Sequence, residues 1–129
     1  MKELLFVTSF MLFSVAVYAQ TFVCTDCNYY GSELSPQRIQ KDKAKYLGSK
    51  ATLTFYDNSL KLSLTENGKV ESLVLDKVND NEYQAIEKEG NKVNKLVLKL
   101  NKWVEYIRSF TIEGYKNYTL ESKFTFKRD

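Results

Sequence analysis

Between Ala51 and Phe126 the chain alternates apolar and polar residues in short runs that end in Asn, Asp or Gly. A period of two places successive side chains on opposite faces of a strand, so each run predicts a β-strand with one buried face. The expected strands lie within residues 51–56, 60–65, 70–78, 83–88, 92–100, 103–113 and 118–126. The last has the clearest alternation, and its inward set would be Tyr118, Leu120, Ser122, Phe124 and Phe126.

Short turns between consecutive strands indicate antiparallel neighbours, and therefore an up-and-down meander. A further strand near residues 21–23 would bring the total to about seven or eight, at which a meander closes to remove its exposed edges. The layout resembles that of the lipocalins and predicts an all-β barrel or half-barrel with one short helix; the alternative is a two-layer β-sandwich. The lipocalin Gly-x-Trp signature is absent, because Trp103 follows Lys102, so no residue roles are transferred from that family.

One segment ahead of the meander carries the signals of a helix over residues 36–47. Ser35 is placed to cap its amino end, Pro36 fits the first helical position, and Gly48 follows its last residue. The opposite, cationic face is expected to meet solvent, with contact to an anionic ligand or a lipid headgroup as the alternative. The apolar face would dock on the sheet or cover a barrel mouth and consists of Ile39, Tyr46 and Leu47.

The first residues have the pattern of a signal peptide. Lys2 supplies a positive start, residues 4–17 form an apolar run, and residues 17–19 offer a site for signal peptidase. We expect cleavage after Ala19; a retained transmembrane helix is the alternative, but the run is shorter than the about 20 residues that span a bilayer. The mature chain would then be secreted or periplasmic, and abundant Asn, Lys and Tyr with a single Pro are typical of an AT-rich, Gram-negative bacterial source.

Length and charge limit the organisation further. At 129 residues, 43% hydrophobic and 27% charged, the chain suits one domain with a modest core. We expect a signal peptide at 1–19, an N-terminal segment at 20–34, and a single β-meander domain with its helix at 35–129. The 19 Lys and Arg against 16 Asp and Glu leave a net charge of +3, too small to indicate a nucleic-acid partner.

The two cysteines are Cys24 and Cys27, separated by Thr25 and Asp26. In an exported chain such a close pair predicts a disulfide that closes a tight local loop. A redox-active pair is the sharper alternative, but Asp26 would raise the thiol pKa rather than lower it. A metal site is disfavoured because two sulfurs without histidine cannot complete tetrahedral zinc coordination. Pairing between two chains is the remaining possibility.

The sequence contains no histidine. That rules out a Ser-His-Asp triad, a Cys-His pair and histidine metal sites, and no other catalytic or cofactor motif stands out. An enzyme is therefore the least favoured class of function, and neither a cofactor nor a metal is expected.

Arg108 is the most informative charged residue. Alternation counted forward from Trp103 puts it on the same face as Val104, Tyr106 and Phe110, which looks buried. An inward guanidinium requires a carboxylate partner or an anionic ligand. The alternative is that a bulge or strand end leaves Arg108 exposed. The predicted ligand site consists of Arg108, Tyr106, Leu62, Leu98 and Phe124.

Fold and compartment favour a secreted, non-enzymatic binding module that holds a small apolar or anionic ligand in or beside the barrel. The second hypothesis is a secreted interaction factor or inhibitor that acts through an exposed aromatic surface on a protein partner. The first predicts an enclosed cavity, and the second predicts a filled core with Trp103 or Tyr56 exposed.

Overall fold

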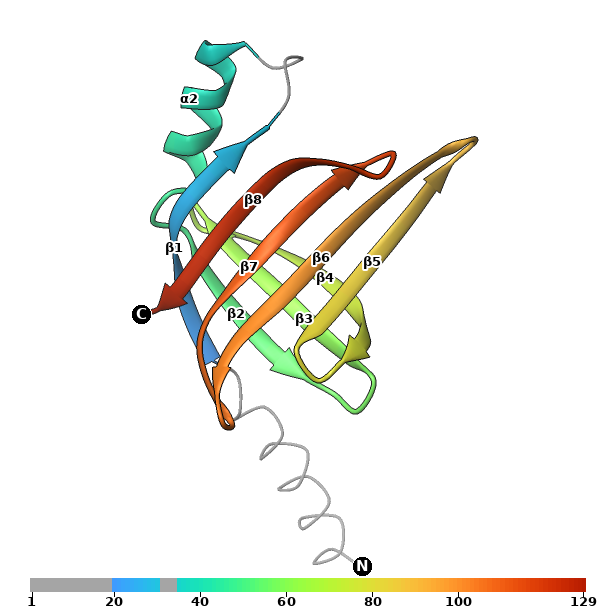
Figure 1. Ribbon diagram of the computed structural model, residues 1–129. Coiled ribbons are helices and arrows are strands. Elements are labelled where there is room, and N and C mark those ends of the chain that lie inside the picture. Colours follow the sequence, from blue (N-terminus) through green and yellow to red (C-terminus); the bar gives the residue numbers. More distant parts are fainter. Residues whose placement is uncertain (1–19, 31–34) are drawn as a thin grey trace, which may run out of the picture.

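A computed structural model describes residues 20–30 and 35–129, so the predicted signal peptide at 1–19 lies outside the described residues. These described residues form eight strands and one helix (Figure 1). The strands are β1 (Gln20–Tyr29), β2 (Lys50–Phe55), β3 (Ser59–Glu66), β4 (Lys69–Asn79), β5 (Glu82–Glu89), β6 (Lys92–Trp103), β7 (Tyr106–Lys116) and β8 (Thr119–Arg128), and the helix is α2 (Pro36–Tyr46).

The strands form a closed barrel in the order β1 to β8, and every neighbouring pair is antiparallel. Pairing of β1 with β8 closes the sheet on itself, which removes both edges. The predicted up-and-down barrel with one short N-terminal helix is therefore confirmed, and the alternative of a two-layer sandwich is wrong. We call the end with the turns after β2, β4 and β6 the filled end, and the end with the turns after β3, β5 and β7 the open end (Figure 1).

The cysteine segment differs from the expected loop, because Cys24 and Cys27 both lie inside β1. The register against β8 shifts between Cys24 and Asp26, so Thr25 is an extra residue in the strand. One inserted residue reverses the facing of those that follow, and both thiols therefore point into the barrel. They are free thiols with Sγ atoms 3.5 Å apart. The prediction of a tight local loop is therefore wrong, while the disulfide between Cys24 and Cys27 stays a prediction.

Helix α2 begins and ends close to where the sequence indicated. The backbone N–H of Arg38 donates to Ser35 Oγ at 3.2 Å, and Pro36 occupies the first turn. The helix ends at Tyr46, and Gly48 takes a φ of +82° that suits glycine. The N–H of Gly48 donates to the carbonyl of Cys24 at 2.9 Å, which fastens the end of α2 to β1. No helix in residues 20–30 and 35–129 is long and apolar enough to cross a bilayer.

The hydrophobic core occupies the filled end. Phe110 and Phe126 stack with ring centroids 4.7 Å apart, and Phe22 meets Phe110 edge-on at 5.0 Å. All three side chains are fully buried, and Arg128 lies over the Phe22 ring at 5.5 Å. The aliphatic residues that complete this packing include Leu53, Leu60, Leu75, Leu98 and Leu100.

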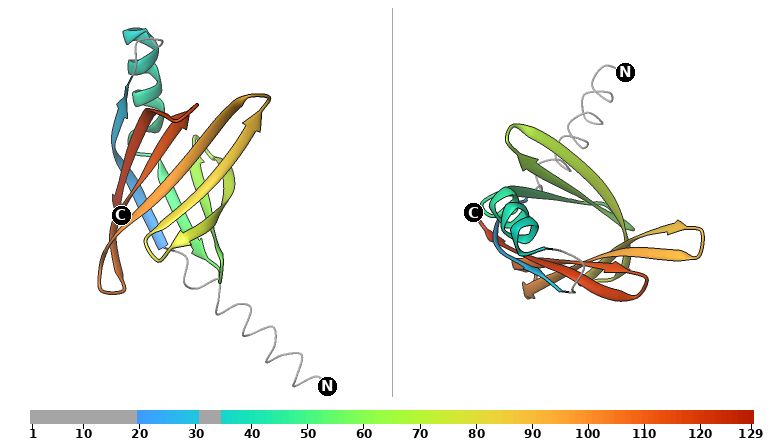
Figure 2. Two further views of the ribbon diagram at one scale, coloured as in Figure 1. Left: turned by 45° about the vertical axis from the view of Figure 1, so that its right-hand side comes forward. Right: turned by 90° about the horizontal axis from the view of Figure 1, so that it is seen from above.

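The barrel is least continuous between β4 and β5. These strands pair only near their shared turn, through Asp76 with Gln84, Lys77 with Tyr83 and Asn79 with Glu82. Beyond those pairs the β5–β6 hairpin splays away from the β3–β4 hairpin toward the open end (Figure 2). We call this opening in the barrel wall the β4–β5 seam.

Candidate ligand cavity

A cavity of about 540 Å³ lies at the open end, directly above the packed core. Its volume falls in the range of about 300–1,000 Å³ typical of small-molecule sites. Leu62 and Ile112, both nearly buried, form its floor. We call this space the central cavity, and its lining consists of Tyr29, Asp42, Tyr46, Leu62, Leu64, Glu71, Ser72, Leu73, Leu96, Ile112, Ser122 and Phe124.

Two further hollows adjoin the central cavity. One of about 600 Å³ opens along the β4–β5 seam and shares Leu73, Leu96 and Ser122 with it. The other, of about 300 Å³, lies at the rim beside α2 and shares Tyr46 and Leu64 with it. The shared walls join the three hollows at the open end.

Small residues help to keep this end hollow. Gly114 on β7 pairs with Ser122 on β8, and both line the seam side of the hollow. A Cβ atom on Gly114 would lie 2.6 Å from Ser122 Oγ, so the two strands approach too closely for a larger residue to fit without adjustment. This glycine–serine pair therefore adds little side-chain volume to the wall of the hollow.

Three aromatic rings from three elements border the central cavity. Tyr29 at the end of β1 meets Phe124 of β8 edge-on, with ring centroids 5.6 Å apart. Tyr46, in the last turn of α2, meets the same Phe124 at 5.2 Å. We call Tyr29, Tyr46 and Phe124 the aromatic trio. All three are partly buried against the core, so their ring positions are set by packing.

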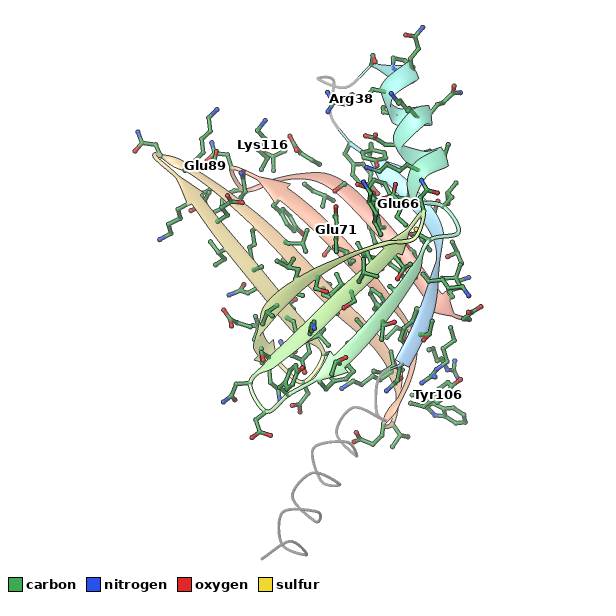
Figure 3. The ribbon with its side chains drawn as sticks, turned by 180° about the vertical axis from the view of Figure 1, so that it is seen from behind. Arg38, Glu66, Glu71, Glu89, Tyr106 and Lys116 are labelled. Carbon is green, nitrogen blue, oxygen red and sulfur yellow. The ribbon has the colours of Figure 1, made fainter. Side chains whose placement is uncertain are left out.

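The charges of the central cavity are carboxylates. Asp42 of α2 and Glu71 of β4 line it, and no Lys or Arg is among its lining residues in the described chain. Burial raises the pKa of the Tyr29 hydroxyl above its ordinary value, and the charge of Asp42 raises it further, so Tyr29 stays a neutral donor. Figure 3 shows Glu71 at the open end of the barrel, on the same side as Glu66 and α2.

At the rim, a lysine contacts this acidic region from outside the central cavity. Lys45 Nζ lies 5.2 Å from the centroid of the Tyr46 ring and 3.8 Å from a carboxylate oxygen of Glu66. Tyr46 first, and then Glu66, raise the pKa of Lys45 above its ordinary value. The rim hollow is thus lined by charges of both signs, Lys45 and Lys69 beside Glu66 and Glu71.

The structure brings together two of the five predicted ligand residues. Leu62 and Phe124 line the central cavity, as expected for inward positions of β3 and β8. Leu98 also points inward, but it is fully buried in the core beneath the cavity.

Arg108 and Tyr106 do not belong to the site, and the face assigned to them was wrong. The turn between β6 and β7 falls at Val104 and Glu105, so Trp103 ends β6 instead of starting the next strand. Arg108 is the extra residue of a bulge, since Asn101 pairs with Ser109 while Lys102 pairs with Ile107. The exposed alternative for Arg108 is therefore the one that holds. Its guanidinium carbon lies 5.0 Å from the Trp103 ring on the outer surface.

Tyr106 lies at the filled end, far from α2 (Figure 3). Its ring contacts the guanidinium carbon of Arg128 at 4.2 Å, and Arg128 Nε donates to the carbonyl of Ile107 at 2.7 Å. Tyr106, Trp103 and Val104 are 53%, 65% and 81% exposed. We call Trp103, Val104 and Tyr106 the β6–β7 tip.

Sequence reasoning missed most of the cavity wall. Tyr46 was placed on the docking face of the helix, and that signal was correct. Glu71 could have been found by extending the inward alternation of β4 back from Leu75 and Leu73, since Glu71 pairs with the inward Leu64. Tyr29 could not, because the bulge at Thr25 sets its facing. Among residues 20–30 and 35–129, no three His, Cys, Asp or Glu side chains gather as a metal site would require.

The chain is similar in fold to a solved structure described as "REP1-NXSQ fatty acid transporter". The two superpose with a TM-score of 0.51 over 88% of this chain and 97% of that one, at 8% sequence identity. No protein-family model matches the chain, and no curated protein matches it. At this identity the likeness is one of fold alone.

Proposed function

We propose that the protein is a carrier that holds a small, largely apolar molecule in the open end of its barrel. The observation that carries the proposal is the contrast within one barrel: the filled end is packed by fully buried residues, while the open end keeps a cavity of about 540 Å³. A hollow of this volume in the mouth of a barrel, lined largely by apolar side chains, is typical of small-molecule sites and supports the proposal.

The chemistry of the lining supports the same proposal. Leu62, Leu64, Leu73, Leu96 and Ile112 surround the cavity with aliphatic carbon. Burial of apolar ligand surface against such walls contributes about 25 cal/mol per Å² removed from water. The description of the structural neighbour as a fatty acid transporter is consistent with an elongated apolar ligand.

Binding of the neutral dye N-phenyl-1-naphthylamine tests the proposal, because its fluorescence rises in apolar surroundings. Two adjacent residues of β4 provide a matched pair, since Leu73, 42% exposed, lines the cavity and Val74, 57% exposed, faces outward. We expect Leu73→Asp to weaken dye binding about tenfold or more, because it places a charge where the apolar dye would bind. Val74→Asp should leave binding unchanged. Absence of dye binding by the unaltered protein would overturn the proposal, as would equal effects of the two variants.

The exposed β6–β7 tip supports a second candidate function, contact with a protein partner. Aromatic residues are enriched in the centres of protein interfaces. Trp103 is 65% exposed, and its ring is covered only in part, by the Arg108 guanidinium. A photoreactive residue at position 103 in the native host should then cross-link one discrete protein, whereas the same residue at Tyr118, also exposed but at the open end, should not. Identical or diffuse cross-linking at the two positions would argue against this role.

We further propose that the carrier works outside the cytoplasm, secreted or in the periplasm. The support is the pattern of residues 2–19, with its positive start, apolar run and peptidase site. Amino-terminal sequencing of protein purified from the native host should begin at Gln20. A cytoplasmic protein that retains Met1 would contradict the proposal.

A further inference from the structure

Resting on the proposed carrier function, the geometry points to a ligand with a cationic head, an alkylammonium or quaternary ammonium group, held by Tyr29, Tyr46 and Phe124 between Asp42 and Glu71. The apolar part of such a molecule would occupy the aliphatic floor of the central cavity.

The aromatic trio has the composition of a cation site. Phe124 contacts both tyrosines, with ring centroids 5.6 Å from Tyr29 and 5.2 Å from Tyr46. The face of an aromatic ring carries negative electrostatic potential and attracts a cation within about 6 Å of its centroid. Rings gathered on one wall therefore offer an ammonium group a more favourable contact than aliphatic carbon does.

The charged residues of the cavity have the matching sign. Asp42 approaches from α2 and Glu71 from β4, and both line the central cavity together with the trio. Neither forms an ion pair within the described residues. An anionic head would need an Arg or Lys beside it, and the lining of the central cavity supplies carboxylates instead. Lysines line the two adjoining hollows, Lys45 and Lys69 at the rim and Lys95 and Lys116 along the seam.

Lys45, the residue before Tyr46, places the protein's own ammonium group beside one ring of the aromatic trio, from outside the central cavity. Its ammonium nitrogen lies 5.2 Å from the Tyr46 ring centroid at the rim and pairs with Glu66 at 3.8 Å. Tyr46 and Glu66 also hold the pKa of Lys45 above its ordinary value. Lys45 therefore competes with a cationic ligand for Tyr46 and would assist an anionic one, so its removal has opposite effects on the two ligand classes.

Three probes with one dodecyl chain and different heads separate the possibilities: dodecyltrimethylammonium, dodecanol and dodecanoate. Each is titrated below its micelle concentration at neutral pH, by displacement of N-phenyl-1-naphthylamine and by calorimetry. We expect the ammonium probe to bind about tenfold more tightly than dodecanoate, with dodecanol between them. Added salt should narrow this difference, because it screens the carboxylates.

Variants that remove one or two charges identify the residues responsible for the preference for the ammonium head. The double variant Asp42→Asn/Glu71→Gln should weaken binding of the ammonium probe about five- to tenfold and leave dodecanol unchanged. Glu89→Gln, at the tip of the β5–β6 hairpin, is the matched control for loss of a carboxylate and should change neither probe (Figure 3). Lys45→Gln should strengthen ammonium binding about twofold or more and weaken dodecanoate binding.

A ring variant separates cation binding from simple burial. Phe124→Leu keeps an apolar wall, so we expect it to weaken ammonium binding about two- to fivefold while dodecanol changes less. Tighter binding of dodecanoate than of the ammonium probe, or equal binding of all three, would overturn the cationic head while the carrier function stands. Failure of all three probes and the dye to bind would overturn both.

Discussion

The two ends of the barrel are built from the same strands, yet only one is packed. Along β7 the inward residues run from Phe110 through Ile112 to Gly114, and along β4 from Leu75 through Leu73 to Glu71. The inward residues of β8 change in the same direction, because Phe126, Phe124 and Ser122 pair with the inward residues of β7. Side chains therefore become smaller or more polar toward the open end. The hollow is encoded strand by strand, since native interiors otherwise fill such space.

Strand β1 marks the boundary between the two ends within a few residues. Cys24 and Cys27 are buried in the core, and the next inward residue, Tyr29, borders the central cavity. The filled end thus supplies the stability that lets the open end stay unfilled. This division predicts that substitutions at the two ends differ in their effects on stability.

The largest difference is expected between two phenylalanines that occupy opposite ends. Phe110→Ala would remove the ring that contacts both Phe22 and Phe126, and should lower the free energy of unfolding by about 3–5 kcal/mol. Phe124→Ala, beside a cavity that already exists, should cost about 1–2 kcal/mol. Urea denaturation monitored by far-ultraviolet circular dichroism measures both. Equal losses would show that the open end is packed as tightly as the filled end.

A smaller effect is expected from the buried thiols, and it depends on pH. Burial first, and then the hydrogen bond with Cys24, raise the pKa of Cys27 from 9.0 to about 12. Since the folded pKa lies above the unfolded one, the stabilisation is fully present below pH 9 and is lost as the pH rises toward 12.

Between pH 9 and 12, under reducing conditions, the free energy of unfolding of the unaltered protein should therefore fall by about 1–3 kcal/mol more than that of the double variant Cys24→Ala/Cys27→Ala. Alkylation by iodoacetamide provides a second measurement. A single cysteine introduced by Leu73→Cys into the Cys24→Ala/Cys27→Ala variant should be alkylated at the rate of an exposed thiol, whereas Cys24 and Cys27 of the unaltered protein should be alkylated slowly. Rapid alkylation of Cys24 or Cys27 in folded protein would contradict their burial on the filled side.

The smallest effect is expected on the outer surface, away from both interiors. Lys99 Nζ lies 2.8 Å from Glu113 Oε1, and that bond raises the pKa of Lys99. Lys99→Met should cost about 1 kcal/mol, because the lysine side chain is half in water but its loss leaves the Glu113 carboxylate, only 9% exposed, without its partner. Lys77→Met, which breaks the pair with the exposed Asp80, is the control and should change stability less. A loss as large as that of Phe110→Ala would show that surface charge, not the core, holds the barrel.

The sequence predicted the strands well because their alternation is regular and their turns carry Asn, Asp or Gly. It failed where one residue is inserted, since a bulge reverses every face that follows. Around the bulge at Thr25, the sequence predicted a loop, whereas the structure has the continuous strand β1. At the second bulge, alternation predicted that the Arg108 guanidinium faces inward, whereas it lies on the outer surface. The turn at Val104 also carries no Gly or Asn, so it gave no signal, although Val104 adopts a φ of +57°.

The cavity was only partly predictable for a different reason. Leu62 and Phe124 follow from alternation within single strands, whereas Tyr46 and Asp42 reach the site because α2 is fastened beside the barrel mouth. Their position depends on contacts between elements far apart in the sequence. No periodicity within one segment reports such contacts.

Native mass spectrometry of the protein purified from its own host tests the central claim most directly. We expect the mass of the chain plus a discrete small molecule, which is released by organic solvent and identified in the extract. The Leu73→Asp variant, expressed in the same host, should carry none. Bare protein alone, together with failure to bind N-phenyl-1-naphthylamine, would contradict the claim that the open end of the barrel is a binding site.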